Sequence, residues 1–315
     1  MIPPLPALQC VATTSPGIAR IPQIDALLGA EVLLRPSAAV DAVVGWGRKP
    51  NTRRARALAA ERGVPFLALE DGFVRSIGLG VEGAPPWSIV VDDVGIYYDA
   101  TQPSRLELLL QESPELDDPE LLARARRCIA AMRQARISKY NASPLLDLGP
   151  KQRRRILVVD QTAGDLSLRL GLAPQRGVAE LVEAALREHQ GAEIIVKTHP
   201  DVASGHKAGG AQSALEHPRV RLITAAANPI AVLEQVDEVY VMTSLLGFEA
   251  LLMGLPVTCF GAPFYAGWGA TTDRVRVERR GAAHHRPGQR GAGAVGAVHA
   301  QFQQRGSAEK VQRLV

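Results

Sequence analysis

With 315 residues, 46% of them hydrophobic and 22% charged, the chain has the composition of a globular protein and the length of two domains. Its formal net charge of +4 favours anionic partners such as nucleotides, lipid head groups or acidic sugars, without indicating nucleic acid. Three cysteines without paired spacing and the lack of a membrane-length apolar run argue against a disulfide scaffold and a transmembrane protein. We expect a cytoplasmic protein without a secretory signal.

In the first half of the chain, apolar runs alternate with helical patterns. Strands are predicted at 42–47, 64–72 and 87–93, and a helix at 52–63 separates the first two. This β-α-β order favours a parallel sheet with helices on both faces. A long basic amphipathic helix is predicted over 116–137.

The same alternation restarts after residue 151. The predicted elements are strands at 155–160, 192–200, 219–224, 238–244 and 256–261, and helices at 177–189 and 245–254. We therefore predict an α/β fold of the GT-B-like kind, with two Rossmann-like domains, 1–148 and 149–280, facing a central cleft. Residues 281–315 lack apolar periodicity, so an atypical, disordered tail is expected.

Polar clusters follow the predicted strands, where ligands bind in open α/β sheets. The clusters are Glu70-Asp71-Gly72, Asp92-Asp93, Asp160 to Asp165, Lys197 to Asp201, and Thr243-Ser244. Any one of them is most simply a turn or a helix cap, but five at strand ends favour a ligand site.

Two of these clusters could hold a phosphate. Lys197 and His199, just before Pro200, offer charge-assisted hydrogen bonds. Thr243 and Ser244 precede a predicted helix, where a phosphate-binding role and an ordinary N-cap are equally supported.

The acids are distributed over both halves. Adjacent Glu70 and Asp71 cannot point the same way, so one of them should face the cleft and could accept a proton from an attacking hydroxyl. Asp71, beside Gly72, is preferred for this role. Asp165 lies in the other half, and two carboxylates on either side of a sugar are typical of glycosyl chemistry.

Longer motifs carry a family resemblance. "LEDGFVRSIGLG", "PPWSIVVDDVGIYYDATQPSRLE", "SKYN", "DQTAGD", "KTHPDV" and "TSLLGFEALLMGLPVTCFGAPFYAGWGATTD" together resemble the capsule polysaccharide β-Kdo transferases of the KpsC/LipA type. The similarity runs from about Gly17 to Asp273. It is greatest to the N-terminal one of that family's two tandem transferase modules.

The resemblance implies a retaining transfer of Kdo from CMP-Kdo onto a (lyso)phosphatidylglycerol-linked poly-Kdo linker in capsular polysaccharide biosynthesis and export. It assigns the acceptor side to the first domain and the nucleotide sugar to the second. The implied partners are the lipid-linked Kdo acceptor, the inner face of the cytoplasmic membrane and capsule assembly proteins. It implies no cofactor besides the donor substrate. No metal is expected, because no Asp-x-Asp motif occurs near a nucleotide site.

The resemblance also implies roles for single residues. Asp165 corresponds to the nucleophile, whereas Asp160 shapes the loop, and Glu70 and Asp71 correspond to the proton-transfer motif. The residues assigned to donor binding are Gln161, Lys197, His199, Pro200, Thr243, Ser244 and Glu249.

The chain departs from the family pattern in two ways, because it has one module and because its sequence after Asp273 is atypical. The alternative function is therefore a catalytically impaired, lipid-saccharide-binding component of the capsule export machinery. Nucleic-acid binding by the basic helix is weaker, since the helix lacks interleaved aromatic residues.

Overall fold

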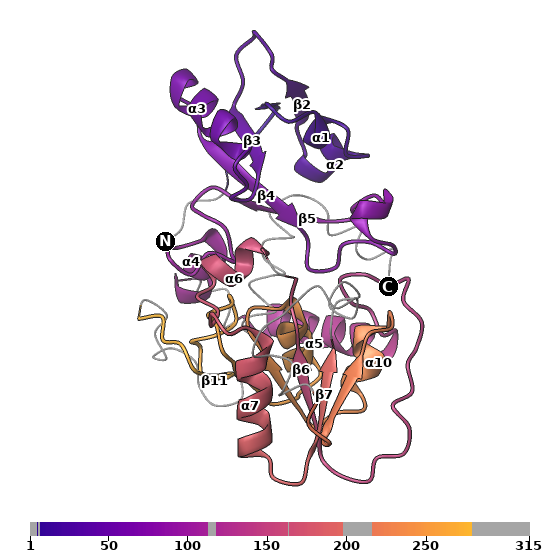
Figure 1. The fold of residues 1–315 in the computed structure, drawn as a ribbon. Coiled ribbons are helices and arrows are strands. Elements are labelled where there is room, and N and C mark those ends of the chain that lie inside the picture. Colours follow the sequence, from indigo (N-terminus) through magenta and orange to yellow (C-terminus); the bar gives the residue numbers. More distant parts are fainter. Residues whose placement is uncertain (1–4, 6, 113–117, 163, 198–215, 279–315) are drawn as a thin grey trace.

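The computed structural model describes residues 5, 7–112, 118–162, 164–197 and 216–278 (Figure 1). The predicted tail over 281–315 and the predicted donor-binding residues His199 and Pro200 lie outside these residues. No helix among those described is long and apolar enough to span a bilayer.

The first sheet has the strand order β2-β1-β3-β4-β5. Its strands are β1 (Cys10–Thr13), β2 (Glu31–Leu34), β3 (Ala42–Trp46), β4 (Phe66–Asp71) and β5 (Ile89–Asp92). The three strands predicted in this half are confirmed, but the expectation of an entirely parallel sheet is wrong, because β5 pairs antiparallel with β4. A parallel return usually needs a crossover helix. The β4–β5 connection contains only the short 3₁₀ turn η1 (Gly80–Glu82).

The helices of the first half are α1 (Pro16–Ala19), α2 (Ile24–Leu28), α3 (Thr52–Arg62), α4 (Arg105–Glu112) and α5 (Pro119–Gln134). The predicted helices α3 and α5 are confirmed. Helix α3 ends at Gly63, which adopts the left-handed conformation (φ 63°) that glycine accepts without strain. The side chain of Asp118 caps the start of α5.

The second sheet is parallel, with the order β11-β10-β9-β6-β7-β8. Its strands are β6 (Arg155–Val159), β7 (Glu193–Lys197), β8 (Val220–Ile223), β9 (Glu238–Val241), β10 (Val257–Cys259) and β11 (Thr272–Asp273), and the helices of this half are α6 (Leu166–Leu170), α7 (Val178–Glu188), α10 (Pro229–Leu233) and α11 (Leu245–Leu252). Every residue of β6 is buried, as expected of a strand covered on both faces. The predicted second α/β half is confirmed.

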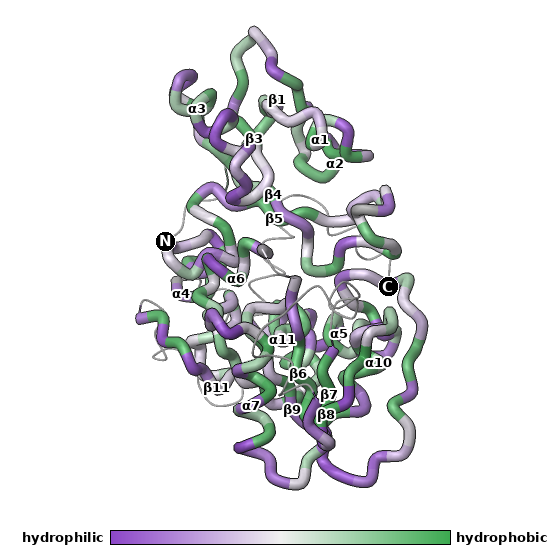
Figure 2. Tube along the Cα trace, viewed as in Figure 1, coloured by the Kyte–Doolittle hydropathy of each residue, from purple (hydrophilic) through white to green (hydrophobic). Residues whose placement is uncertain are grey.

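The two sheets lie at opposite ends of the molecule (Figure 1). The central strands of the second sheet consist largely of hydrophobic residues (Figure 2). Leu106 and Leu109 of α4 and Ala125 of α5 share one buried cluster with Leu157 of β6 and Ile195 of β7. Helices that precede residue 149 thus contribute to the core around the second sheet, and the domain boundary at 148/149 stays a prediction.

Candidate active site between the two domains

A cavity of about 880 Å³, here called the main cavity, lies between the two halves of the chain. Strands β4, β6 and β7 bring their carboxyl ends to it, the position where open α/β sheets bind ligands. Its lining includes Lys49, Glu70, Tyr97, Tyr98, Ser138, Lys139 and Tyr140 from the first half and Asp160, Gln161, Asp165, Ser167, Lys197, Thr243, Ser244 and Glu249 from the second.

Glu70 is the acid that the first domain presents to the main cavity. Its Oε1 accepts hydrogen bonds from Trp46 Nε1 at 3.0 Å and from the backbone nitrogen of Asp71 at 3.1 Å. A Cβ at Gly47 would lie 3.0 Å from Glu70 Oε2, so the glycine leaves room for the carboxylate. Burial raises the pKa of Glu70, despite these two donors.

Asp71 points away from Glu70, as alternation along a strand requires. Its Oδ1 accepts from Arg75 Nε at 2.7 Å. Its Oδ2 accepts from the Tyr140 hydroxyl at 3.3 Å and lies 3.5 Å from Lys139 Nζ. Among the described residues, the cavity lining contains Glu70 and does not contain Asp71. Asp71 instead holds Lys139 and Tyr140, which do line the cavity.

The cluster at Asp92 and Asp93 has a structural role. Asp92 Oδ1 accepts from the backbone nitrogens of Val94 and Gly95 at 2.9 and 2.7 Å. Asp93 forms an ion pair with Arg105 at 2.5 Å. These two acids organise the turn that leads to α4, and neither is among the described residues of the cavity lining.

Asp165 lines the main cavity from the second domain, where it is exposed at the start of α6. Its carboxylate caps this short helix by accepting from the backbone nitrogen of Ser167 at 2.9 Å. Asp160 Oδ1 accepts from the backbone nitrogen of Gln161 at 2.9 Å, a contact that suits the predicted loop-shaping role.

Gln161 joins the ends of two strands. Its Oε1 accepts from the backbone nitrogen of Thr243 at 2.8 Å, and its Nε2 donates to Thr243 Oγ1 at 3.1 Å and to Ser167 Oγ at 3.3 Å. The amide is therefore already engaged within the protein, and its geometry suits positioning of the Asp165 loop against Thr243.

Lys197 and Ser244 present a cation and a hydroxyl to the same cavity. Ser244 caps α11, because its Oγ accepts from the backbone nitrogen of Leu246 at 3.2 Å. Lys197 ends β7, and burial lowers its pKa. Within the described parts of the chain, Lys197 has no ion-pair partner.

Glu249 connects the two halves. This residue of α11 is 5% exposed, and its Oε1 accepts from Ser138 Oγ at 2.7 Å and from the backbone nitrogen of Lys139 at 3.0 Å. Burial raises the pKa of Glu249 to about 7. Its role in this structure is to fasten the Ser138–Tyr140 segment, which in turn contacts Asp71.

Tyr97, Tyr98, Lys139 and Tyr140 also line the main cavity, although no site role was predicted for them from the sequence. The "YYD" and "SKYN" stretches that contain them served only as marks of the family resemblance, since neither follows an apolar run directly. Burial raises the pKa of all three tyrosines. A sequence signal for these tyrosines did exist: they carry hydroxyl groups and belong to a chain in which only 4% of the residues are aromatic. Among the described residues, no cluster of three or more acids, histidines or cysteines could hold a metal.

The sequence of the chain is similar to those of several known bacterial proteins. A family model described as capsule polysaccharide biosynthesis protein matches residues 41–149 and 142–304. The capsule polysaccharide modification protein LipA of Neisseria meningitidis serogroup A is 46% identical over 265 residues, which are 82% of this chain and 38% of LipA. The lipopolysaccharide-processing protein LpsZ of Rhizobium meliloti is 40% identical over 76% of this chain and 55% of its own length. The chain thus spans well under half of LipA.

Two solved structures are similar over nearly the whole chain. The β-Kdo 2,4 transferase of Thermosulfurimonas dismutans KpsC has a TM-score of 0.80 and 42% identity, covering 92% of this chain and 90% of that one. The β-Kdo 2,7 transferase of the same protein has a TM-score of 0.66 and 28% identity, covering 91% and 89%. The predicted GT-B-like fold, with two Rossmann-like domains facing a cleft, is confirmed. The chain belongs to the KpsC/LipA family of capsule polysaccharide biosynthesis proteins.

Proposed function

We propose that the chain is a retaining glycosyltransferase that moves Kdo from CMP-Kdo onto a (lyso)phosphatidylglycerol-linked Kdo acceptor in capsular polysaccharide biosynthesis. One observation carries this proposal: Glu70 and Asp165, carboxylates from opposite halves, line the same cavity. Retaining glycosyl transfer through a covalent intermediate uses a nucleophile and an acid/base in this relation. Membership of a family whose solved structures include two Kdo transferases supports the choice of sugar.

In the first step, the carboxylate of Asp165 attacks the anomeric carbon of Kdo. A bond forms between Asp165 and that carbon as the bond to the phosphate oxygen breaks, and CMP leaves with the electron pair. Asp165 suits this role because it is exposed to the cavity and sits on a short loop pinned by Gln161.

In the second step, a hydroxyl of the acceptor attacks the same carbon and displaces Asp165, while Glu70 accepts the hydroxyl proton. Two successive inversions give net retention. The raised pKa of Glu70 suits a proton acceptor, because a base with a pKa nearer to the operating pH transfers protons more effectively. We propose Glu70 for this role in preference to Asp71, whose carboxylate is engaged by Arg75, Lys139 and Tyr140.

The donor phosphate would bind at the ends of β7 and β9. Lys197 lies there without a described ion-pair partner, and Thr243 and Ser244 face the same space. A phosphate would supply the missing counter-charge for Lys197. His199 and Pro200, predicted for the same role, lie outside the described residues. Partners at the membrane surface and among capsule assembly proteins belong to this proposal as well.

The test is direct. Purified protein is incubated with CMP-Kdo and a synthetic Kdo-lipid acceptor, and the acceptor is analysed by mass spectrometry. A mass gain of one Kdo that requires Asp165 is expected. If the acceptor binds but gains no Kdo, the chain is the impaired saccharide-binding component instead.

A further inference from the structure

A second cavity, of about 310 Å³, lies at the opposite edge of the second sheet. It is here called the arginine pocket. It is lined by Leu148, Pro150, Gln152, Arg153, Arg155, Glu193, Pro218, Arg219, Val220 and Arg221. Its strand residues begin β6, β7 and β8, whereas the main cavity meets the ends of β6 and β7. A five-residue strand is roughly 16 Å long, so the two cavities are separate sites.

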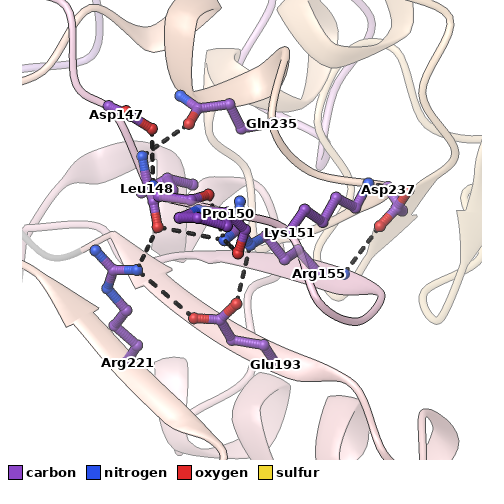
Figure 3. Close-up of polar contacts among 10 residues, drawn as sticks. Asp147, Leu148, Pro150, Lys151, Arg155, Glu193, Arg221, Gln235 and Asp237 are labelled. Atoms are coloured by element: carbon purple, nitrogen blue, oxygen red, sulfur yellow. Dashed lines mark hydrogen bonds and ion pairs between the residues drawn. The ribbon is translucent and has the colours of Figure 1, made fainter.

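The floor of the arginine pocket is preformed. Arg155 is 3% exposed and forms an ion pair with Glu193 at 2.9 Å. It also donates to the carbonyl oxygens of Leu148, Gly149 and Pro150 at 3.2, 2.9 and 3.1 Å. Figure 3 shows Arg155 with Leu148, Pro150 and Glu193, and Glu193 lies between Arg155 and Arg221. A buried guanidinium held by this many acceptors keeps the pocket in one shape.

Two other arginines carry donors that face solvent. Arg221 has a side chain 45% exposed, donates to Leu148 O at 2.7 Å and lies 3.7 Å from Glu193. Arg153 is exposed, and within the described parts of the chain it has no ion-pair partner. Among the described residues, the guanidinium of Arg219 donates to the carbonyl oxygens of Leu186, His189 and Ala192, which carry no formal charge.

The charge of the arginine pocket is therefore unbalanced. Among the described residues that line it, four arginines and one carboxylate, that of Glu193, leave an excess of three positive charges around a cavity of about 310 Å³. Other cations of the basic run over 151–155 are neutralised nearby, Lys151 by Asp237 at 2.6 Å and Arg154 by Glu238 at 2.8 Å. The excess is thus specific to the pocket, and clustered like charges are unfavourable unless an anion joins them.

We propose that the arginine pocket binds a phosphoryl group, carried either by a lipid head group or by a small soluble phosphate ester. The planar, always charged guanidinium matches phosphate oxygens in paired hydrogen bonds, so arginine is the side chain best suited to this anion. The volume fits a head group or a small ester. This site is additional to the donor phosphate site proposed above and does not depend on it.

The experiment compares wild-type protein with the double variant Arg153→Ala/Arg221→Ala. Both side chains are exposed, so the variant should keep its fold, which thermal unfolding verifies. Arg53→Ala/Arg54→Ala, which removes two exposed arginines of α3, is the matched control for the loss of two positive charges. Glycerol 1-phosphate is titrated calorimetrically. Vesicles of phosphatidylcholine, with and without phosphatidylglycerol, are tested by co-sedimentation. Transfer to a soluble acceptor is measured in parallel.

Arg153→Ala/Arg221→Ala should bind one of the probes about tenfold more weakly or worse, while the control Arg53→Ala/Arg54→Ala binds like wild type. Loss with the vesicles alone identifies a lipid head group, and loss with glycerol 1-phosphate identifies a soluble ester. The proposal is overturned if wild type binds neither probe, if Arg153→Ala/Arg221→Ala binds both as well as wild type does, or if Arg53→Ala/Arg54→Ala loses as much affinity. Unchanged transfer in Arg153→Ala/Arg221→Ala separates this result from the fate of the proposed function.

Discussion

On the first-domain side of the main cavity, the adjacent acids Glu70 and Asp71 are half-buried among hydrogen-bond donors, whereas on the second-domain side Asp165 is exposed at the start of a short helix. Glu70 accepts from Trp46, and Asp71 lies among Arg75, Lys139 and Tyr140. Among the hydrogen bonds described for it, the carboxylate of Asp165 accepts only the local one from the backbone nitrogen of Ser167.

This difference suits the two proposed roles. Burial raises the pKa of Glu70, as a proton acceptor requires, and the surrounding donors fix its orientation. An attacking carboxylate instead needs an accessible oxygen, which exposure at a loop provides. The two walls are joined by Glu249, which reaches from α11 to Ser138 and Lys139.

The largest expected effect separates the reacting role of Asp165 from its capping role. Asn caps a helix about as well as Asp but is not a nucleophile. Asp165→Asn should therefore lower transfer on the order of 10³-fold or more, with unchanged thermal stability and retained CMP-Kdo binding. A covalent Kdo adduct on the wild-type peptide containing Asp165 would be direct support. If Asp165→Ala keeps more than a few per cent of the turnover while Asp160→Ala does not, the nucleophile is assigned wrongly.

The next largest effect is expected from Glu70. Glu70→Gln should slow transfer from the adduct to the acceptor by about 10²–10⁴-fold and leave adduct formation nearly unchanged. Because burial raises the pKa of Glu70 and the base must be deprotonated, wild-type activity should fall with decreasing pH at a higher pH than an ordinary glutamate would give. Stopped-flow rates across pH would show this limb, and it should be absent from Glu70→Gln.

Asp71→Asn is the matched control for that experiment. It removes the charge that holds Arg75 and Lys139, so a smaller, pH-independent loss is expected. If Asp71→Asn instead abolishes the acidic limb and Glu70→Gln does not, the adjacent acid is the base, as preferred from sequence.

Glu249, which links the two sides of the main cavity, should make the free energy of unfolding depend on pH. Glu249 has a pKa raised from 4.5 to about 7, so the folded state binds its proton more tightly than the unfolded state. The resulting stabilisation is fully present below pH of about 4.5 and is lost as the pH rises to about 7. It amounts to at most roughly 3 kcal/mol.

Glu249→Gln keeps an acceptor for Ser138 without burying a charge, so it should remove this dependence. Urea midpoints at about pH 5 and about pH 8 would measure the difference between the two proteins. Parallel pH profiles for wild type and variant would contradict the assignment.

The smallest effect concerns the donor phosphate. Lys197→Met and Ser244→Gly should each weaken CMP binding by about 1–3 kcal/mol, the cost of a hydrogen bond to a charged group. Glycine is chosen because it keeps the N-cap of α11 at little cost. Calorimetry with CMP decides the matter, and unchanged affinity in both variants would leave Ser244 as a helix cap alone.

Much of the site could be predicted from the chain because strand ends and polar clusters coincide in the sequence. Asp165, Lys197 and Thr243 follow apolar runs, and parallel strands bring their ends to one edge. The same rule grouped Asp92 and Asp93 with the other polar clusters because they lie at the end of a strand, but neither is among the described residues that line the main cavity. That strand runs antiparallel, so its end lies at the opposite edge of the first sheet.

Other features could not be predicted because they depend on contacts between distant residues. Lys139 and Tyr140 are held at the main cavity by hydrogen bonds to distant residues. The backbone nitrogen of Lys139 donates to Glu249, more than a hundred positions away, and the hydroxyl of Tyr140 donates to Asp71. The arginine pocket gathers Arg155, Glu193 and Arg221 from three strands (Figure 3). In the sequence, the run over 151–155 is simply basic, and only its ion pairs distinguish neutralised from unbalanced charges.

The sequence by itself determined the alternation of strands and helices, the family and the set of polar residues at strand ends, because periodicity and ordered motifs are local properties. The tertiary structure alone decided which of Glu70 and Asp71 faces the main cavity and that Asp165 is exposed while Glu249 is buried. The physical reason is that the direction of a side chain and the loss of its water depend on neighbours supplied by the other half of the chain.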